Sequence, residues 1–158
     1  MLCRPVGVNG IAAGARPLSS MSPTVVLGPS GAVVATAGGS GGTRILTAVA
    51  QVLLRVLAGG EAVAAAVAAP RLHHPWLPAA ASMEGTAVKA PDACALVAVP
   101  VVDAVPPPPW ARVCADLRRR GHELGASRPS QVQAIVVGRG GGITAASDPR
   151  KEGAAEAY

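Results

Sequence analysis

A doublet of serines between two prolines is the first stretch of the sequence that could bind a ligand. Ser19 and Ser20 lie in RPLSSMSPT (16–24), where Pro17 and Pro23 favour an extended backbone. Two neighbouring hydroxyls are able to donate hydrogen bonds to one carboxylate. Serine hydroxyls ahead of a strand also form local turns with the backbone. The doublet alone therefore leaves both a carboxylate site and a simple turn open.

A glycine-rich stretch, GGSGG (38–42), precedes a helical pattern that begins at Thr43. Glycine lets backbone N–H groups approach a ligand, and a helix start adds unpaired N–H groups and a positive dipole end. Together these features predict an anion site. A nucleotide-binding P-loop needs a lysine after the last glycine, where this sequence has Thr43 and Arg44. A carboxylate or the oxyanion of an acyl transfer needs only N–H donors, and a plain turn stays equally open.

The remaining polar clusters favour structural roles. His73 and His74 stand beside Trp76 without further ligands at local spacing. These patterns favour packing over metal binding, and no cofactor is indicated. The C-terminal polar residues Asp148, Arg150, Lys151 and Glu152 are predicted to form a solvated, ion-paired tail. Within this tail, Asp148 is also suited to cap backbone N–H groups of the loop after the preceding hairpin.

Hydrophobic periodicity and turn residues predict the elements that position these groups. The predicted elements are a hairpin over 24–38, a helix over 43–60, a short helix over 61–70, a proline-rich connector over 70–78, a short strand over 82–89, a helix over 110–124 capped by Gly121, and a hairpin over 131–148 with its turn at 138–142. This order predicts an α+β or layered α/β fold with antiparallel pairing and no βαβ repeat.

Composition limits the size of the core and the class of partner. The 158 residues include 19 glycines, 15 prolines and no phenylalanine, which predicts a loop-rich chain or one partly unable to fold by itself. The net charge is +5; among the arginines, Arg118, Arg119 and Arg120 are adjacent and the others are scattered. Without stacking aromatics, these three indicate a solvated helix end and not a nucleic-acid site.

Cysteine spacing and apolar runs say little about metal binding or localisation. The three cysteines, Cys3, Cys94 and Cys114, have no metal-type spacing. The sequence has no apolar run long enough for a spanning helix, and its first residues do not have the unbroken apolar stretch of a signal peptide. Localisation is therefore not readable from these residues.

Several stretches taken in order resemble one family. RPLSSMSPT, GGTRI, APRLHHPWLP, RGHE, VQAIVV and ASDPR resemble the small subunit of γ-glutamyltransferases, also called γ-glutamyl transpeptidases or glutathione hydrolases. The resemblance covers residues 16–84 and 117–158. Residues 1–15 are interpreted as a loop, and 16–158 as a partial small-subunit domain with a proline-rich insertion at 85–109. The resemblance implies part of a four-layer αββα fold of the N-terminal nucleophile hydrolase type.

The resemblance also implies a reaction. In that family a precursor cuts itself into a large and a small subunit, and a new N-terminal threonine attacks the γ-glutamyl carbonyl of glutathione or another γ-glutamyl donor. Water, an amino acid or a dipeptide then accepts the γ-glutamyl group. By this resemblance Ser19 and Ser20 bind the α-carboxylate of the γ-glutamyl group, and the N–H groups of Gly41 and Gly42 form the oxyanion hole. The setting implied is extracytoplasmic: periplasmic, extracellular or membrane-associated.

The nucleophilic threonine of the family has no match in this sequence. The threonines present, Thr24, Thr36, Thr43, Thr47, Thr86 and Thr144, all lie inside the chain without a free α-amine. We therefore expect this chain alone to be inactive and, with unpaired sheet edges, poorly soluble or partly ordered. The alternatives are a non-catalytic small-subunit-like binding or pairing protein and, apart from the resemblance, a basic anion-binding module with salt-dependent affinity for polyanions.

Overall fold

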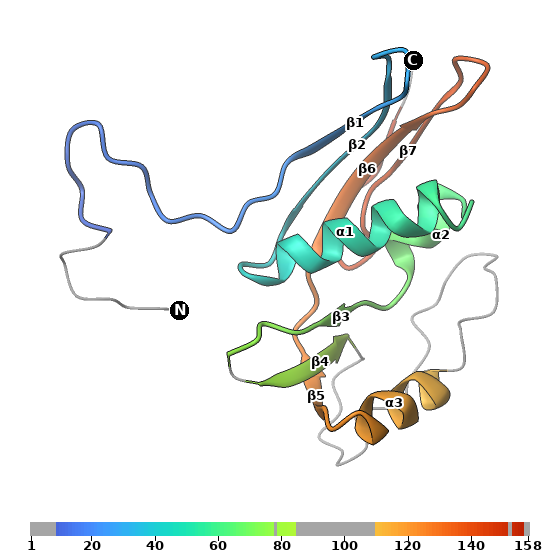
Figure 1. Cartoon of the computed structure of the whole chain (residues 1–158). Coiled ribbons are helices and arrows are strands. Elements are labelled where there is room, and N and C mark those ends of the chain that lie inside the picture. Colours follow the sequence, from blue (N-terminus) through green and yellow to red (C-terminus); the bar gives the residue numbers. More distant parts are fainter. Residues whose placement is uncertain (1–8, 78, 85–109, 152, 157–158) are drawn as a thin grey trace.

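The structure is a computed structural model that describes residues 9–77, 79–84, 110–151 and 153–156 (Figure 1). The predicted insertion at 85–109, with Thr86 and Cys94, lies outside the described residues, as do Cys3 and Glu152. The described elements combine helices with two sheets, so the predicted α+β class is confirmed.

The larger sheet is built from the two predicted hairpins. Strands β1 (Thr24–Leu27) and β2 (Val33–Ser40) form the first hairpin, and β6 (Gln131–Val137) and β7 (Ile143–Ala146) form the second. The strand order is β1-β2-β6-β7, and β2 pairs with β6 in antiparallel fashion. The β-branched runs on either side of glycine-containing turns explain why both hairpins were predictable.

Two helices cover one face of this sheet (Figure 1). Helix α1 (Arg44–Leu57) and helix α2 (Val63–Ala68) lie within the predicted ranges 43–60 and 61–70. The buried core between helices and sheet consists of small aliphatic side chains and contains no aromatic residue; its fully buried members include Val52, Val67 and Val132. Such a core supplies many small contacts and few large anchors.

The opposite face of the same sheet is apolar and exposed. Val25, Ile135 and Ile143 are 61%, 44% and 70% exposed. Val25 pairs with Thr36, Thr36 with Ile135, and Ile135 with Ala145, so the row runs across the sheet on one face. A face of this kind is typical of a surface that another layer covers.

The smaller sheet has the strand order β3-β4-β5 and corrects two predictions. Strand β3 (Leu72–His73) lies inside the predicted connector, and β5 (Glu123–Ser127) begins inside the predicted helix 110–124. Helix α3 (Trp110–Arg119) ends earlier because Gly121 adopts φ +85° and the N–H of His122 donates to the carbonyl of Leu117 at 3.0 Å.

Strand β4 (Ala80–Glu84) lies in the middle of the smaller sheet and overlaps the predicted strand 82–89. It pairs antiparallel with β3 but parallel with β5. The described residues therefore include one parallel pair, with α3 between its strands in the sequence, whereas antiparallel pairing was predicted. A small second core packs Met83 and Cys114 against Leu72, Val113 and Leu124.

The end of α3 carries the adjacent arginines. Arg119 and Arg120 are 78% and 69% exposed, and both pair with Asp116. The hydrogen bond from Arg120 lowers the pKa of Asp116. The predicted solvated helix end is therefore confirmed for these two arginines. Over the described ranges, no helix has the length and apolarity needed to span a membrane.

Candidate functional site

Gly41 and Gly42 connect the end of β2 to the start of α1. Both have positive φ, +137° and +66°, which favours glycine. Gly41 has a second constraint, because a Cβ built on it would lie 2.8 Å from the Cβ of Ser130. The predicted glycine loop is shorter than expected, since Gly38, Gly39 and Ser40 belong to β2 and pair with β6.

The beginning of α1 has the features of an anion site. Thr43 is the N-cap residue and makes no side-chain capping hydrogen bond, and the first turn contains no acidic residue. N–H groups at a helix start that have no capping partner, together with the positive dipole end, favour a bound anion. The loop geometry thus fits the N–H-donating site predicted from the sequence.

Ser19 and Ser20 lie in an exposed segment without regular structure before β1. Ser19 Oγ accepts a hydrogen bond from the N–H of Met21 at 3.1 Å, which is the local turn left open by the sequence. The carbonyl of Ser20 accepts a hydrogen bond from Ser22 Oγ at 3.3 Å. Hydroxyls bound only to their own segment at the surface remain accessible to a ligand.

The two predicted halves of the site leave the first hairpin at the same end. Thr24, the first residue of β1, pairs with Ala37 of β2, and β2 then continues to Ser40 and the glycine loop. Figure 1 shows the segment before β1 leaving the sheet at the end where α1 begins. The described residues include no hydrogen bond between the serine pair and the glycine pair, so their joint action on one ligand stays a prediction.

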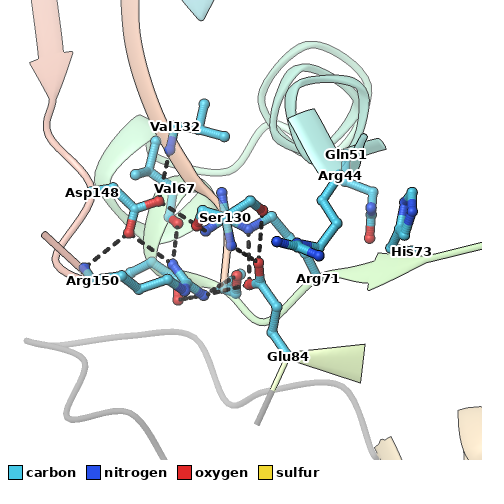
Figure 2. A network of polar contacts seen from close by, with 12 residues as sticks. Arg44, Gln51, Val67, Arg71, His73, Glu84, Ser130, Val132, Asp148 and Arg150 are labelled. Carbon is cyan, nitrogen blue, oxygen red and sulfur yellow. Dashed lines mark hydrogen bonds and ion pairs between the residues drawn. The ribbon is translucent and has the colours of Figure 1, made fainter. Parts of the chain in front are cut away.

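Ser130, which lies against Gly41, belongs to a buried polar network that the sequence did not predict (Figure 2). Its charged members are two arginines and two carboxylates, and the four side chains are between 0% and 8% exposed: Arg71, Glu84, Asp148 and Arg150. Two positive and two negative charges balance within the network. Buried charges are tolerated when they are paired and hydrogen-bonded in this way.

Asp148 is fully buried and accepts four hydrogen bonds. Oδ2 accepts from Arg71 Nη2 and from the N–H of Val132, both at 2.8 Å, and Oδ1 accepts from the N–H and Nη1 of Arg150, both at 3.0 Å. Burial alone raises the pKa of this carboxyl, but the hydrogen bonds from Arg150, Arg71 and Val132 outweigh it and lower the pKa. The expected capping role is confirmed, whereas the solvated setting predicted for Asp148 is wrong.

Arg150 was also placed wrongly in a solvated tail. Its guanidinium donates to the carbonyls of Val67, Ala68 and Ala69 at 2.9–3.1 Å, at the C-terminal end of α2. Helix C-termini leave unpaired carbonyls that favour a cation. Arg150 therefore joins the end of α2 to Asp148 and Glu84, and only Lys151 of the described tail residues is exposed as predicted.

Glu84 and Arg71 connect the network to Ser130. Glu84 Oε1 accepts hydrogen bonds from both the N–H and the Oγ of Ser130 at 2.8 Å. Arg71 donates from Nη2 to the carbonyl of Ser130 at 2.9 Å and from Nε to Glu84 Oε2 at 3.0 Å. Every polar group of Ser130 is thus bound, and this residue is the one that contacts Gly41.

The histidines take structural positions. His73 Nδ1 lies 2.9 Å from Thr47 Oγ1, and the pKa of His73 is lowered by burial and by the positive charge of Arg44. His74 and His122 contact edge to face at 5.4 Å. Among the residues that the structure describes, no group of three or more histidine, cysteine or acidic side chains is arranged for a metal ion.

Sequence reasoning missed Arg71, Glu84 and Ser130 as a group. Arg71 and Glu84 are isolated charges next to apolar residues, and Ser130 immediately precedes a strand. Each of these signals is weak by itself, because the partners lie 13 to 77 residues apart. Only the fold brings them together.

A sequence model of the family described as "Gamma-glutamyltranspeptidase" matches residues 1–158. Over 143 residues the chain is 34% identical to "Glutathione hydrolase proenzyme" of Escherichia coli (strain K12), covering 90% of this chain and 21% of that protein. It is 33% identical to "Glutathione hydrolase 2" of Arabidopsis thaliana, covering 98% of this chain and 25% of that protein. The chain thus spans about a fifth to a quarter of the length of these curated relatives.

A solved structure shares the arrangement. The gamma-glutamyltranspeptidase of Pseudomonas nitroreducens complexed with L-DON superposes with a TM-score of 0.70 at 30% identity. The superposition covers 98% of this chain and 70% of that chain. The likeness therefore extends over nearly all of the sequence and includes both sheets.

Proposed function

The chain belongs to the gamma-glutamyltranspeptidase family, and from that premise we propose that its Gly41–Gly42 loop is the oxyanion hole of a site for γ-glutamyl transfer and hydrolysis. The described residues form part of the N-terminal nucleophile hydrolase fold, as the superposed structure indicates. The single observation that carries the proposal is the loop itself: two positive-φ glycines at the start of a helix whose N-cap side chain makes no capping bond.

The proposed reaction uses these N–H groups in both steps. A threonine hydroxyl attacks the γ-glutamyl carbonyl carbon, and the negative charge that develops on the carbonyl oxygen is held by the N–H groups of Gly41 and Gly42. The C–N bond then breaks, the amine leaves with a proton, and a γ-glutamyl ester remains. Water or an acceptor amine attacks the ester in the same way. One such N–H donor contributes about 3 kcal/mol to transition-state stabilisation.

Ser19 and Ser20 complete the proposed donor site. Their exposed hydroxyls are proposed to bind the α-carboxylate of glutathione or another γ-glutamyl donor, with an amino acid, dipeptide or water as acceptor. The nucleophilic threonine and the rest of the site are proposed to come from residues other than these 158, including the large subunit. The proposal also puts the site outside the cytoplasm, in a periplasmic, extracellular or membrane-associated setting.

The exposed sheet face supports a protein partner or a further layer of the same protein. Val25, Ile135 and Ile143 form an apolar row on the open face of the larger sheet. In a four-layer αββα fold, the second β layer would cover this face. Because the nucleophilic threonine and this covering layer are proposed to lie outside these 158 residues, we propose that the chain is inactive alone.

The first test is the mass of the native product, meaning the protein that carries residues 1–158 as its source makes it. An antibody against residues 147–156 would isolate it. A product with an N-terminal threonine that hydrolyses a γ-glutamyl anilide supports the proposal. A product of the mass of Met1–Tyr158 without that activity favours the non-catalytic binding or pairing protein.

The second test separates donor binding from chemistry in the native product. Ser19→Ala and Ser20→Ala are expected to raise KM for the γ-glutamyl donor about tenfold, the equivalent of one lost hydrogen bond to a charged group. Ser30→Ala, an exposed serine in the β1–β2 turn, is the matched control. An unchanged KM in both site variants would remove the serine pair from the proposal.

A further inference from the structure

We propose that Ser130 is a positioning residue for the Gly41 N–H, and that Glu84 holds Ser130 in place. This inference rests on the proposed function, because it concerns the loop assigned there as the oxyanion hole. It adds two residues, Ser130 and Glu84, that act on the backbone donor without touching the substrate.

The contact between Ser130 and Gly41 is the first step. Ser130 is 1% exposed and immediately precedes β6, whose first residue, Gln131, pairs with Ser40 at the end of β2. The position of a Cβ on Gly41 lies 2.8 Å from Ser130 Cβ and 3.1 Å from Ser130 Cα. The Gly41 backbone therefore rests directly on Ser130, and any movement of Ser130 changes where the loop lies.

The restraint on Ser130 is the second step. Glu84 Oε1 accepts hydrogen bonds from the N–H and the Oγ of Ser130, both at 2.8 Å, while Arg71 binds its carbonyl. Glu84 is the last residue of β4 in the smaller sheet, whereas Ser130 adjoins the larger sheet. Figure 2 shows the contacts between Glu84 and Ser130. One carboxylate of the smaller sheet thus holds the residue that lies against Gly41.

The catalytic consequence is geometric. An oxyanion donor acts only when it is aimed at the position where the charge develops, and small misplacements of reacting groups reduce rates by 10- to 100-fold. The loop itself has few restraints, since two glycines form it and Thr43 makes no side-chain cap. Ser130 therefore supplies the packing that the loop lacks.

Two readouts on the native product test the proposal. Hydrogen exchange of peptides spanning residues 40–45 reports on the loop, and kcat and KM for a γ-glutamyl anilide report on catalysis. Ser130→Ala is expected to speed loop exchange about tenfold and to lower kcat about tenfold, with KM within about twofold. Thr144→Ala, an exposed hydroxyl on β7, is the matched control for the loss of one hydroxyl.

A pair of variants at position 84 separates positioning from general stability. Glu84→Asp keeps the charge but shortens the reach to Ser130, whereas Glu84→Gln keeps the reach and removes the charge. Removing the buried charge should make Glu84→Gln the less stable variant, with the lower urea midpoint. If Glu84 positions Ser130, Glu84→Asp should nevertheless show the faster loop exchange and the lower kcat of the two. If kcat and loop exchange instead follow the urea midpoint, Glu84 acts through stability alone and the inference is overturned.

The outcomes also distinguish this inference from the proposed function. Unchanged loop exchange in both Ser130→Ala and Glu84→Asp overturns the positioning role, whatever the activity. Faster loop exchange with unchanged kcat supports the positioning of Gly41 and removes the oxyanion-hole assignment instead. Should Ser130→Ala not fold, the comparison of the two Glu84 variants decides by itself.

Discussion

Replacing Asp148 by asparagine is expected to destabilise the larger sheet by about 3–5 kcal/mol, the usual consequence of breaking a buried ion pair. Both carboxylate oxygens accept two hydrogen bonds each, from Arg71 and Val132 on one side and from Arg150 on the other. An amide keeps only one acceptor oxygen, so two donors lose their partner in either orientation. The change also leaves two buried cations facing one carboxylate, Glu84.

The effect should depend on pH in a defined direction. The folded pKa of Asp148 is lowered from its ordinary value of 3.8, so the ionised carboxylate stabilises the folded state. This stabilisation is fully present above pH 3.8 and is lost as the pH falls through the lower, folded pKa. The difference in unfolding free energy between the native residue and asparagine should therefore be constant near neutrality and shrink in acid.

The assay measures hydrogen exchange of β6 peptides in the native product at increasing urea concentrations, which gives the unfolding free energy of the larger sheet. Asp116→Asn is the control. Asp116 is also paired with two arginines and has a lowered pKa, but its side chain is 40% exposed, near the end of α3. The control should leave β6 unchanged. A loss below about 1 kcal/mol in Asp148→Asn, or a loss that persists unchanged as the pH falls well below 3.8, would refute the reasoning.

Three further predictions concern the core and the sheet faces. Gly39→Ala puts a Cβ 2.4 Å from the carbonyl oxygen of Gln131 and should lower stability by about 1–3 kcal/mol or more in thermal denaturation, whereas Gly38→Ala meets no atom within 4 Å and should be tolerated. Val52→Ala, at a fully buried position, should lower the urea-measured stability by about 2 kcal/mol, against about 0.5 kcal/mol or less for exposed Leu54→Ala. Ile143→Lys should make the isolated 158-residue chain more soluble and prevent assembly of the active native product, as measured by sedimentation and by activity.

The elements with strong local signals were predictable from the sequence. The hairpins follow from β-branched runs around glycine turns, and α1 from apolar residues at helical spacing such as Ile45, Val49 and Val52. The glycine loop ahead of α1 also followed from the sequence, whereas its N–H-donating role stays a proposal. In these stretches, local preference and tertiary contacts agree.

Strand β5 shows why other parts could not be predicted. Its sequence, ELGAS (123–127), contains one large apolar side chain and no β-branched residue. It becomes a strand because Gly121 ends α3 and the chain then returns beside β4 in parallel. The pairing partner, more than forty residues away in sequence, supplies the preference that the residues themselves lack.

The buried polar network could not be predicted from the sequence, for a related reason. Asp148 and Arg150 lie among polar and small residues, in SDPRKE, and this composition is typical of a solvated tail. Their burial depends on Arg71 and Glu84, which balance their charges from a different part of the chain. Charge balance between distant segments has no periodicity, so no local pattern announces it.

The same network explains how a chain without phenylalanine joins its two sheets. The aliphatic core under the larger sheet and the small core around Met83 and Cys114 are separate clusters. Between them, one link runs from Glu84 of the smaller sheet to Ser130 and, through Arg71 and Arg150, to Asp148 beside the larger one. Because hydrogen-bonded ion pairs are directional, they fix the relative position of the two sheets more sharply than loose aliphatic contacts would. The proposed oxyanion loop rests on this junction, so its geometry depends on residues from both sheets.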